Sequence, residues 1–407
     1  MSLNIQQCLK CKQARCVKAC PIRTPIPEVI QLVQSGEITQ AQQRLFENNL
    51  FSSVCSIICD HHRQCFGNCV LNAKGTPINF YQLEQEISKE YLFQVHLKKE
   101  VEKDQRIAII GAGPAGINAA ILLALKGYQI TLFDDHPKVG GILRYGIPEY
   151  RLSKDIVDEY ERLLLELKVN IRPNTKIGTL INIEDLLADQ YDAVFIASGV
   201  WNPRKLDIKG ETLGHVHYAT DYLYSPSSYH LGDKVIVIGA GNVAMDAART
   251  LKREGKDVSI YYRKSFEDMP ANQVELQDAR DEGVKFVLFK APKEVTPTGV
   301  IFEDTENILV DGRVTTKILE GTSSFVECDS LIVAVSQSPE DTLMRTTDNL
   351  LANRYGLLAV DEAMMTSRKG VFAAGDIVSG ADTVVGAVMM SKIAVEKIDE
   401  YLKTKAA

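Results

Sequence analysis

RIAIIGAGPAG, residues 106–116, is the stretch that decides the fold of this 407-residue chain. Its first five residues form an apolar run typical of a buried strand, and its glycine-rich loop leads into a helix predicted over residues 117–127. A further strand over residues 129–134 completes a strand–helix–strand unit. In such a loop the first glycine allows a tight turn, the second lets the backbone approach a pyrophosphate, and the third lets the helix pack on the strand. We therefore predict a dinucleotide site, the alternative being an ordinary strand–helix turn.

The helix after this loop begins where the phosphates of a dinucleotide would lie. Its unpaired N–H groups and the positive end of its dipole favour a phosphate at that point. An acid follows the first glycine by 23 residues, which is where a ribose hydroxyl binds in this type of fold. The residues predicted to face the dinucleotide are Gly111, Gly113, Pro114, Ala115, Gly116 and Asp134.

The same unit returns 128 residues later, with the strand KVIVI (234–238), the loop GAGNVA, a helix over residues 245–255 and a strand over residues 258–262. Alanine is allowed as the third small residue of such a loop. Tyr262 stands where the first unit has its acid, and two cations follow it. A base there suits a 2′-phosphate, and the alternative is a solvated surface pair. The residues predicted to bind this second nucleotide are Gly239, Gly241, Asn242, Val243, Arg263 and Lys264.

Two dinucleotide folds in one chain favour a flavin enzyme, in which one fold binds FAD and the other delivers hydride from a nicotinamide. A thioredoxin-reductase-like enzyme would carry a redox cysteine pair in its nicotinamide domain, but no cysteine occurs between residues 70 and 327. Electrons must therefore leave by another route. We expect an α/β fold of doubly wound parallel sheets with helices on both faces. Further strands are predicted over residues 192–198, 284–289, 330–335 and 370–376, and a last helix over residues 386–402.

Eight of the nine cysteines lie before residue 70, in the runs C-x2-C-x4-C-x3-C-P (residues 8–21) and C-x3-C-x5-C-x3-C (residues 55–69). The first run is close to a ferredoxin run, in which the last cysteine binds a second cluster. Its first three cysteines would then bind one cluster, and its fourth would bind a second cluster. Cys69, from the second run, could be the remaining ligand of the first cluster. Zinc, which prefers paired CxxC knuckles, and unligated thiols are the alternatives. Cys328 is expected to be a small buried core residue.

The composition argues against several classes of function. The net charge is −7 and the pI is near 5.6, which argues against nucleic acid as a partner. No apolar run reaches the ~18 residues of a membrane span, so no membrane is expected. The N-terminal MSLNIQQC has no apolar signal-peptide region. Clustered cysteines in a large chain without such a signal indicate a cytoplasmic protein whose thiolates hold metal.

These motifs together resemble the glutamate synthase small (beta) subunit family, which includes the flavin and iron–sulfur subunit of bacterial dihydropyrimidine dehydrogenase. The resemblance covers essentially the whole chain. It rests on the cysteine pattern and on GAGPAG, GGILRYGIPEYRL, GAGNVAMDAARTLK, YYRKSFEDMPA and VFAAGDIVSGADTVVGAV. It implies FAD, NADPH (or NADH) and two 4Fe–4S clusters. The domains implied are a helical double-cluster iron–sulfur domain (1–103), a discontinuous FAD-binding domain (104–228 and 350–407) and an NAD(P)H-binding domain (229–349).

The resemblance also implies ligands for the two clusters. In relatives the fourth ligand of the second cluster is a Glu or Gln on the helix after the cysteines. Glu84 aligns best with it, Gln85 is one residue away, and the cysteine count alone would favour Cys55. The first cluster would be held by Cys8, Cys11, Cys16 and Cys69. The second would be held by Cys20, Cys59, Cys65 and Glu84.

For FAD the resemblance adds three elements. They are a glycine doublet, a Gly–Asp pair whose carboxylate takes a ribityl hydroxyl, and the backbone that opens the last helix and faces the flavin ring. No catalytic acid or base is predicted, because hydride and electron transfer depend mainly on positioning. The added residues are Gly140, Gly141, Gly375, Asp376, Thr383, Val384 and Val385.

The expected function is that of an electron-input subunit, in which NADPH reduces FAD and single electrons reach a partner through the clusters. The chain is too short for a separate substrate domain, so we expect a hetero-oligomer with a catalytic subunit of dihydropyrimidine dehydrogenase or glutamate synthase type. Residues 263–266 resemble the pyrimidine branch, which we favour, whereas GGILRYGIPEYRL resembles the glutamate synthase branch. The alternatives are a free-standing oxidoreductase that reduces ferredoxin or a small acceptor, and a scaffold with vestigial sites.

Overall fold

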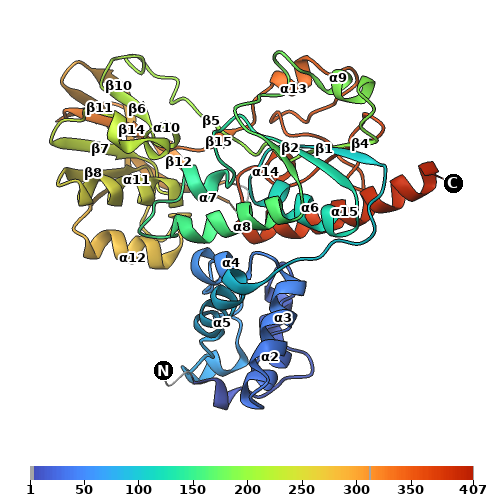
Figure 1. Cartoon of the computed structure of the whole chain (residues 1–407). Coiled ribbons are helices and arrows are strands. Elements are labelled where there is room, and N and C mark those ends of the chain that lie inside the picture. The colour runs from blue at the N-terminus through green and yellow to red at the C-terminus, as the bar shows by residue number, and fades with distance from the viewer. Residues whose placement is uncertain (1–3, 311–312, 407) are drawn as a thin grey trace. The chain divides into compact units, whose positions relative to one another are not determined.

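The computed structural model describes residues 4–310 and 313–406 and divides the chain into two compact units, whose elements are labelled in Figure 1. The first unit takes in the chain up to Arg144, Glu149–Val200 and the chain from Pro339 on. The second unit consists of Tyr145–Pro148 and Trp201–Ser338. In the described part of the chain, none of the helices combines the length and the apolar character that a membrane span requires.

The first unit begins with a small helical domain. Val29, Ile30 and Leu45 are buried at its centre, on helices whose apolar residues recur at helical spacing. Gly36 has φ +82° and ends the first long helix, so the next one turns back beside it. The elements are η1 (Asn4–Gln7), α1 (Arg15–Ala19), α2 (Ile26–Gln34), α3 (Ile38–Asn48), α4 (Ser52–Ile58), η2 (Val70–Lys74) and α5 (Phe80–Gln94).

A five-stranded parallel sheet follows in the same unit, with the strand order β16-β4-β1-β2-β3. Its central strand is the apolar run quoted first, which is buried on both faces as parallel strands usually are. Helices α6 and α15 pack against each other, and Ser391 of α15 donates to the Ala115 carbonyl at 2.7 Å. The elements are β1 (Arg106–Ile110), α6 (Pro114–Leu125), β2 (Gln129–Phe133), α7 (Ile142–Tyr145), α8 (Lys154–Glu166), β3 (Asn170–Arg172), α9 (Ile183–Ala188), β4 (Ala193–Ile196), α13 (Thr342–Arg345), β16 (Val371–Ala373), α14 (Asp376–Ser379) and α15 (Val384–Ala406).

The second unit contains a matching parallel sheet, with the order β6-β14-β7-β8-β9. Its edge strand β6 pairs with β14, which brings residues 201–228 into this unit. The boundary expected at residue 229 would have placed them in the FAD-binding domain. The elements are β5 (Asn202–Pro203), β6 (Val216–Tyr218), α10 (Ala219–Tyr224), η3 (Pro226–Ser228), β7 (Lys234–Ile238), α11 (Asn242–Arg253), β8 (Asp257–Tyr262), α12 (Gln273–Asp281), β9 (Lys285–Leu288), β14 (Ser330–Val333) and β15 (Gln337–Ser338).

An antiparallel sheet, which was not expected, is inserted between β9 and β14. Its long strand β11 pairs with β10, β12 and β13. Phe302 on β11 is fully buried and stacks on Tyr261 of the parallel sheet, with ring centroids 4.3 Å apart. Its strands follow one another without helices, so the strand–helix alternation of the sequence does not reveal them. The elements are β10 (Lys290–Thr296), β11 (Gly299–Val310), β12 (Arg313–Ile318) and β13 (Ser324–Glu327).

Within the first unit, the helical domain is joined to the parallel-sheet domain by contacts of α8. Tyr160 stacks on Phe51 with ring centroids 4.3 Å apart, and its hydroxyl donates to the Leu50 carbonyl at 2.9 Å. Arg162 donates to the carbonyls of Leu92 and Val95 at 3.0 and 3.1 Å. Because Phe51 immediately precedes α4, these contacts fix the start of a helix whose other end reaches the cysteines.

Candidate functional site

The first group of cysteines lies beside the N-terminal loop. One cavity is lined by Cys8, Cys11, Cys16 and Cys69, with Cys65 also at its wall. The first four are half-buried. Burial raises the pKa of Cys16 to about 11, and the neighbouring sulfurs add to the shift. The structure thus brings together the four cysteines that the resemblance assigns to the first cluster, and we call them site 1.

The second group is Cys20, Cys59, Cys65 and Glu84, and we call it site 2. Burial raises the pKa of Cys65 far above its usual range, and Glu84 and Cys20 add to this shift. A hydrogen bond with Cys55, together with burial, raises the pKa of Cys59 as well. These shifts show that the four predicted ligands lie close together, in surroundings that disfavour negative charge as long as no cation is bound.

Glu84 is the unusual member of site 2. It is 6% exposed, and burial raises its pKa well above the usual range. Within residues 4–310 and 313–406, no hydrogen bond or ion pair reaches its carboxylate. A buried carboxylate is normally paired or bound to metal, so Glu84 is chemically suited to be the fourth ligand. Cys55 is 4% exposed and lies one helical turn before Cys59, so it stays the competing candidate.

The spacing of the sulfurs distinguishes between kinds of metal centre. Among the described residues, no three cysteine sulfurs lie within 4.8 Å of one another. A single zinc ion with Zn–S bonds of about 2.3 Å would hold tetrahedral sulfurs about 4 Å apart. Neither described cysteine group thus holds three sulfurs as close together as one zinc ion requires, and a polynuclear iron–sulfur cluster, whose ligands lie further apart, is the better match to these donors.

Thr24 is a residue of site 2 that the sequence analysis missed. Its side chain is 4% exposed, and its hydroxyl lies 3.3 Å from the Cys20 sulfur. When Cys20 is a thiolate, the hydroxyl must be the donor of this hydrogen bond. The signal in the sequence is only a threonine four residues after a cysteine, which is too common a pattern to attract notice.

Two glycines of the first loop, Gly111 and Gly116, are packed so closely that they cannot be replaced. A Cβ on Gly116 would lie 1.8 Å from the Gly111 carbonyl oxygen, and one on Gly141 would lie 2.7 Å from the Gly113 Cα. The loop and the glycine doublet therefore touch, as the resemblance implies. No side chain caps the N-terminus of α6, which leaves its first N–H groups available to a phosphate.

Asp134, the expected ribose acid, already has partners in the protein. Its Oδ2 accepts from the Ala112 N–H at 2.5 Å, and its Oδ1 accepts from the His136 N–H at 2.8 Å. Burial acts to lower the pKa of His136, but its hydrogen bonds with Asp134 and Asp135 raise it to about 9. Asp134 thus fixes the shape of the glycine loop, and Oδ2 keeps a lone pair for a ribose hydroxyl.

Asp376 lies beside the N-terminus of α6. A Cβ on the preceding Gly375 would be 3.2 Å from the Cβ of Ala115, so the two segments are in contact. Burial raises the pKa of Asp376 to about 7, and none of the described lysines or arginines forms an ion pair with it. Nearby, the Thr383 hydroxyl accepts from the Gly386 N–H at 3.2 Å and so caps the start of α15, whose first residues are Val384 and Val385. The residues predicted to bind FAD thus converge at one edge of the first sheet.

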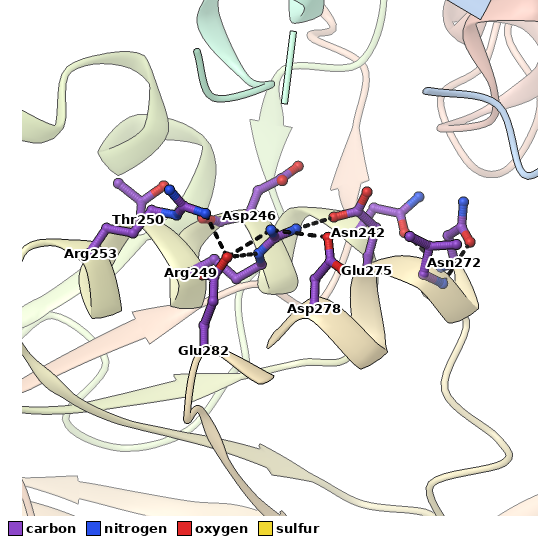
Figure 2. A network of polar contacts seen from close by, with 10 residues as sticks. Asn242, Asp246, Arg249, Thr250, Arg253, Asn272, Glu275, Asp278 and Glu282 are labelled. Carbon is purple, nitrogen blue, oxygen red and sulfur yellow. Dashed lines mark hydrogen bonds and ion pairs between the residues drawn. The ribbon is translucent and has the colours of Figure 1, made fainter. Parts of the chain in front are cut away.

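The second glycine loop has the shape of the first but more open space. A Cβ on Gly241 would meet nothing within 4 Å, so a ligand can approach the backbone there. Ala244, the third small residue of the loop, is fully buried in the same core cluster as Val235 and Val237 of β7. Asn242 opens α11, and its Oδ1 accepts from the Asn272 N–H at 2.8 Å, as Figure 2 shows. This bond ties the loop to the start of α12.

A buried charge network holds α12 against α11 (Figure 2). Arg249 is 5% exposed and donates to Glu275 at 2.7 Å and to Glu282 at 2.8 Å. Arg253 donates to the same Glu282 oxygen at 2.6 Å, and Asp278 pairs with Arg249 at 3.1 Å. Because a buried guanidinium without partners would be costly, this network couples the glycine-loop helix to its neighbour. The partners lie 26 to 33 residues apart, so the sequence alone did not reveal them.

The segment after β8 forms a closed loop rather than a free strand end. The Tyr262 hydroxyl donates to the Asp268 carbonyl at 2.9 Å. The Asp268 carboxylate accepts from Ser265 at 2.8 Å and from Asn307 of β11 at 2.6 Å. The unexpected antiparallel sheet thus helps to hold the loop that carries the two predicted phosphate-binding cations.

These two cations differ in their surroundings. The Lys264 ammonium donates to the Val314 carbonyl of β12 at 3.1 Å. Arg263 is exposed, and its carbonyl accepts from the Thr305 hydroxyl at 2.7 Å, which fixes its backbone. Across the described ranges, no acidic side chain pairs with the Arg263 guanidinium. Arg263 is therefore the better placed of the two to take a phosphate.

Comparison with known families agrees with this arrangement. Residues 105–391 match the model of the pyridine nucleotide-disulphide oxidoreductases. Residues 3–94 match the 4Fe–4S cluster domain II of dihydropyrimidine dehydrogenase. The chain is thus an NAD(P)H-dependent flavin oxidoreductase with an iron–sulfur domain, and the predicted α/β fold is confirmed.

Solved structures show a similar fold over the two nucleotide-binding units. FprA from Mycobacterium tuberculosis in complex with NADPH is 19% identical, with a TM-score of 0.65, over 75% of this chain and 86% of that one. The thioredoxin reductase of T. acidophilum is 20% identical, with a TM-score of 0.57, over 74% of this chain and 100% of that one. At such identities the likeness concerns the fold alone.

Curated relatives extend over nearly the whole chain. The small chain of NADPH glutamate synthase from Azospirillum brasilense is 34% identical over 98% of this chain and 89% of its own length. The corresponding chain of Escherichia coli K12 is 29% identical over 98% and 90%. The beta subunit of the NADP(+)-dependent formate dehydrogenase of Moorella thermoacetica is 31% identical over 96% and 60%. Fold, site and relatives agree, and the chain belongs to the glutamate synthase small chain family within the pyridine nucleotide-disulphide oxidoreductases.

Proposed function

We propose that this chain is the electron-input subunit of a larger redox assembly, which accepts hydride from NADPH and delivers single electrons to a partner protein. The observation that carries the proposal is that sites 1 and 2 belong to the same compact unit as the first glycine loop. Helix α4 connects them, because it begins beside Tyr160 of the flavin fold and ends at Cys59.

FAD bound to the first fold would convert two-electron hydride transfer into one-electron transfer. The chain's own residues bind and orient this group. The open N-terminus of α6 takes the pyrophosphate, Asp134 takes a ribose hydroxyl, and Asp376 accepts a hydrogen bond from the ribityl chain. The amide edge at residues 383–385 borders the ring, and the dipole of α15 favours negative charge there.

NADPH would bind to the second fold. Gly239 and Gly241 let the backbone approach its pyrophosphate, with Asn242 and Val243 at the open end of α11. The loop after β8 offers Arg263 as a planar, bidentate donor to the 2′-phosphate, with Lys264 as a weaker second cation. Tyr262 replaces the acid that would repel a phosphate at this position.

Sites 1 and 2 would each hold one 4Fe–4S cluster. Four thiolates suit the first, and three thiolates with the Glu84 carboxylate suit the second. Support comes from the donor sets and from sulfur spacings that exceed those of a single zinc ion.

The partner would supply the substrate chemistry. The relatives reported above favour a catalytic chain of glutamate synthase type over the pyrimidine type that the sequence favoured. A partner of another kind is also compatible with these relatives, since one of them is a formate dehydrogenase subunit. A free-standing reductase of a ferredoxin-like carrier is the second candidate. Purification of the natural complex distinguishes them, because a stoichiometric second chain is expected only for an input subunit.

The nucleotide assignment is tested with Arg263→Ala. Hydrogen bonds to charged groups contribute roughly 1.5–3 kcal/mol, so NADPH affinity should fall on the order of tenfold to a hundredfold. NADH affinity should hardly change, and Lys264→Ala, the matched control, should lose less. The measurement is kcat/KM for both nucleotides with a dye at low salt, together with direct binding of 2′,5′-ADP and AMP. Equal losses for both nucleotides would leave Arg263 only a general docking role.

The flavin assignment is tested with Asp376→Ala and Asp376→Asn. Losing a buried hydrogen bond typically costs about 1–3 kcal/mol, so Asp376→Ala should release FAD on gel filtration, whereas Asp376→Asn, which keeps an acceptor oxygen, should release less. Their iron content should stay close to that of the wild type, because Asp376 is not a predicted cluster ligand. Full flavin occupancy in both variants would contradict the role of Asp376.

A further inference from the structure

The surface around site 1 has a charge opposite to that of the chain as a whole. The segments 4–23 and 65–78, which supply all four cysteines of site 1, contain six lysines and arginines and no acid, although the chain has a net charge of −7. We call these six cations the basic rim. They are Lys10, Lys12, Arg15, Lys18, Arg23 and Lys74.

The cations of the basic rim are not neutralised by the protein. All six side chains are exposed, and none forms an ion pair with any described residue. Elsewhere in the helical domain cations do find partners, as Arg44 does with Glu28 at 2.8 Å and Arg63 with Asp60 at 3.4 Å. Unpaired like charges carried on two segments that meet at site 1 repel one another, so an acidic partner would relieve that repulsion.

An apolar side chain lies among these charges. Leu9 is 62% exposed, and it lines the same cavity as Cys8, Cys11 and Arg15. An exposed apolar residue surrounded by charged ones is the arrangement of a protein interface, with an apolar centre and a polar rim. Because Leu9 and Arg15 line the same cavity as the sulfurs of site 1, both side chains lie close to that site.

We infer that the basic rim and Leu9 form the docking face for an acidic redox protein that takes electrons from site 1. The inference deepens the proposed function and rests on it. One NADPH gives up two electrons and yields NADP+ and one proton, and two one-electron acceptors are reduced in turn. Charge attraction between such faces accelerates encounter and aligns the partners, and the effect weakens as salt screens it.

The first experiment uses the wild-type holoenzyme. It compares NADPH-driven reduction of an acidic plant-type ferredoxin with that of a neutral quinone, as the ionic strength is raised. We expect the second-order rate for ferredoxin to fall at least tenfold between low and high salt, and the quinone rate to stay nearly constant. A ferredoxin rate that does not depend on salt would overturn the inference.

The second experiment reverses charges on the face. Lys12→Glu/Lys18→Glu/Lys74→Glu should lower the ferredoxin rate at low salt by tenfold or more, with the quinone rate and the iron content unchanged. Lys98→Glu/Lys369→Glu changes exposed, unpaired cations outside the two segments and should have little effect. Equal losses in both variants would overturn the assignment to this face. If the triple variant loses iron, the salt dependence of the wild-type ferredoxin rate still tests whether docking depends on charge.

Two further outcomes separate the alternatives. Retardation of a short DNA duplex by the wild type but not by the triple variant would assign the face to nucleic acid instead. If the wild type lacks iron or fails to reduce the quinone, the proposed function itself fails. If it reduces the quinone normally but shows no salt dependence with ferredoxin, only the docking face is refuted.

Discussion

Sites 1 and 2 have nearly the same donor atoms but very different surroundings. The cysteines of site 1 are all half-buried, the segments that carry them bear six unpaired cations, and exposed Leu9 lines their cavity. Site 2 contains buried Cys65 and Glu84 beside half-buried Cys20 and Cys59, and Thr24 is hydrogen-bonded to its Cys20. Its Cys59 ends α4, whose other end is fixed to the flavin fold.

The difference suggests that the chain divides the task of electron transfer between the two sites by their environment rather than by ligand type. Site 2 is the more buried of the two, and because reduction adds negative charge to a cluster, burial favours its oxidised form. Site 1 faces solvent under a positive surface, which favours the reduced form.

The largest effect concerns iron content. We expect about eight irons per chain after anaerobic purification, and about four after either Cys16→Ala or Cys59→Ala, because each removes a ligand of a different site. Iron and sulfide analysis with EPR checks this. The two variants should lack different signals. A wild type with only about four irons would show that only one of the two sites holds a cluster.

The next effect concerns the eighth ligand. Glu84→Ala should lose the iron of site 2, Glu84→Gln should keep most of it because an oxygen donor remains, and Cys55→Ala should lose little. Iron analysis of the three variants decides. If Cys55→Ala loses as much iron as Cys59→Ala while Glu84→Ala loses none, Cys55 is the ligand and site 2 is chemically like site 1.

A smaller effect concerns the lability of the two centres. Chelator in air should remove iron from the half-buried site 1 several-fold faster than from site 2, where Cys65 and Glu84 are buried. Cys59→Ala retains only site 1 and Cys16→Ala only site 2, so each rate can be followed by itself from the loss of absorbance. Equal rates would show that exposure of the sulfurs does not distinguish the sites.

The smallest effect concerns Thr24. Thr24→Val keeps the shape but removes the hydrogen bond to Cys20, so the midpoint potential of site 2 should fall. A typical hydrogen bond contributes about 0.5–1.5 kcal/mol, which corresponds to roughly 20–65 mV for one electron. Thr24→Ser should stay close to the wild type in an EPR-monitored redox titration. An unchanged potential in Thr24→Val would remove this distinction between the sites.

Local patterns in the sequence were enough to predict the two nucleotide folds. The strands at residues 106–110 and 234–238 occur as expected, because an apolar run followed by a glycine loop has few other ways to fold. The last helix begins at Val384, next to the residues expected to face the flavin. The grouping of Cys69 with Cys8 came from family resemblance, since spacing alone left it open.

Features that depend on distant partners could not be predicted in this way. Thr24 matters because of where Cys20 lies, and the role of Arg249 depends on acids of another helix. The antiparallel sheet changes the relation between Arg263 and Lys264 because β12 offers a carbonyl to the lysine only. Each of these depends on a contact between segments whose meeting is set by the whole fold.

The joint between Phe51 and Tyr160 has a consequence for anyone who builds chimeras of this protein. Residues 95–105 form no helix or strand and look like a convenient crossover point between two modules. Yet the flavin fold supplies Tyr160 and Arg162, whose hydrogen bonds hold the turn before α4 and the end of α5. A donor iron–sulfur domain exchanged at this boundary would arrive without its matching surface. A working chimera should therefore take α8 from the same protein as the N-terminal domain. The unit that can be exchanged is larger than the segment that ends at the linker.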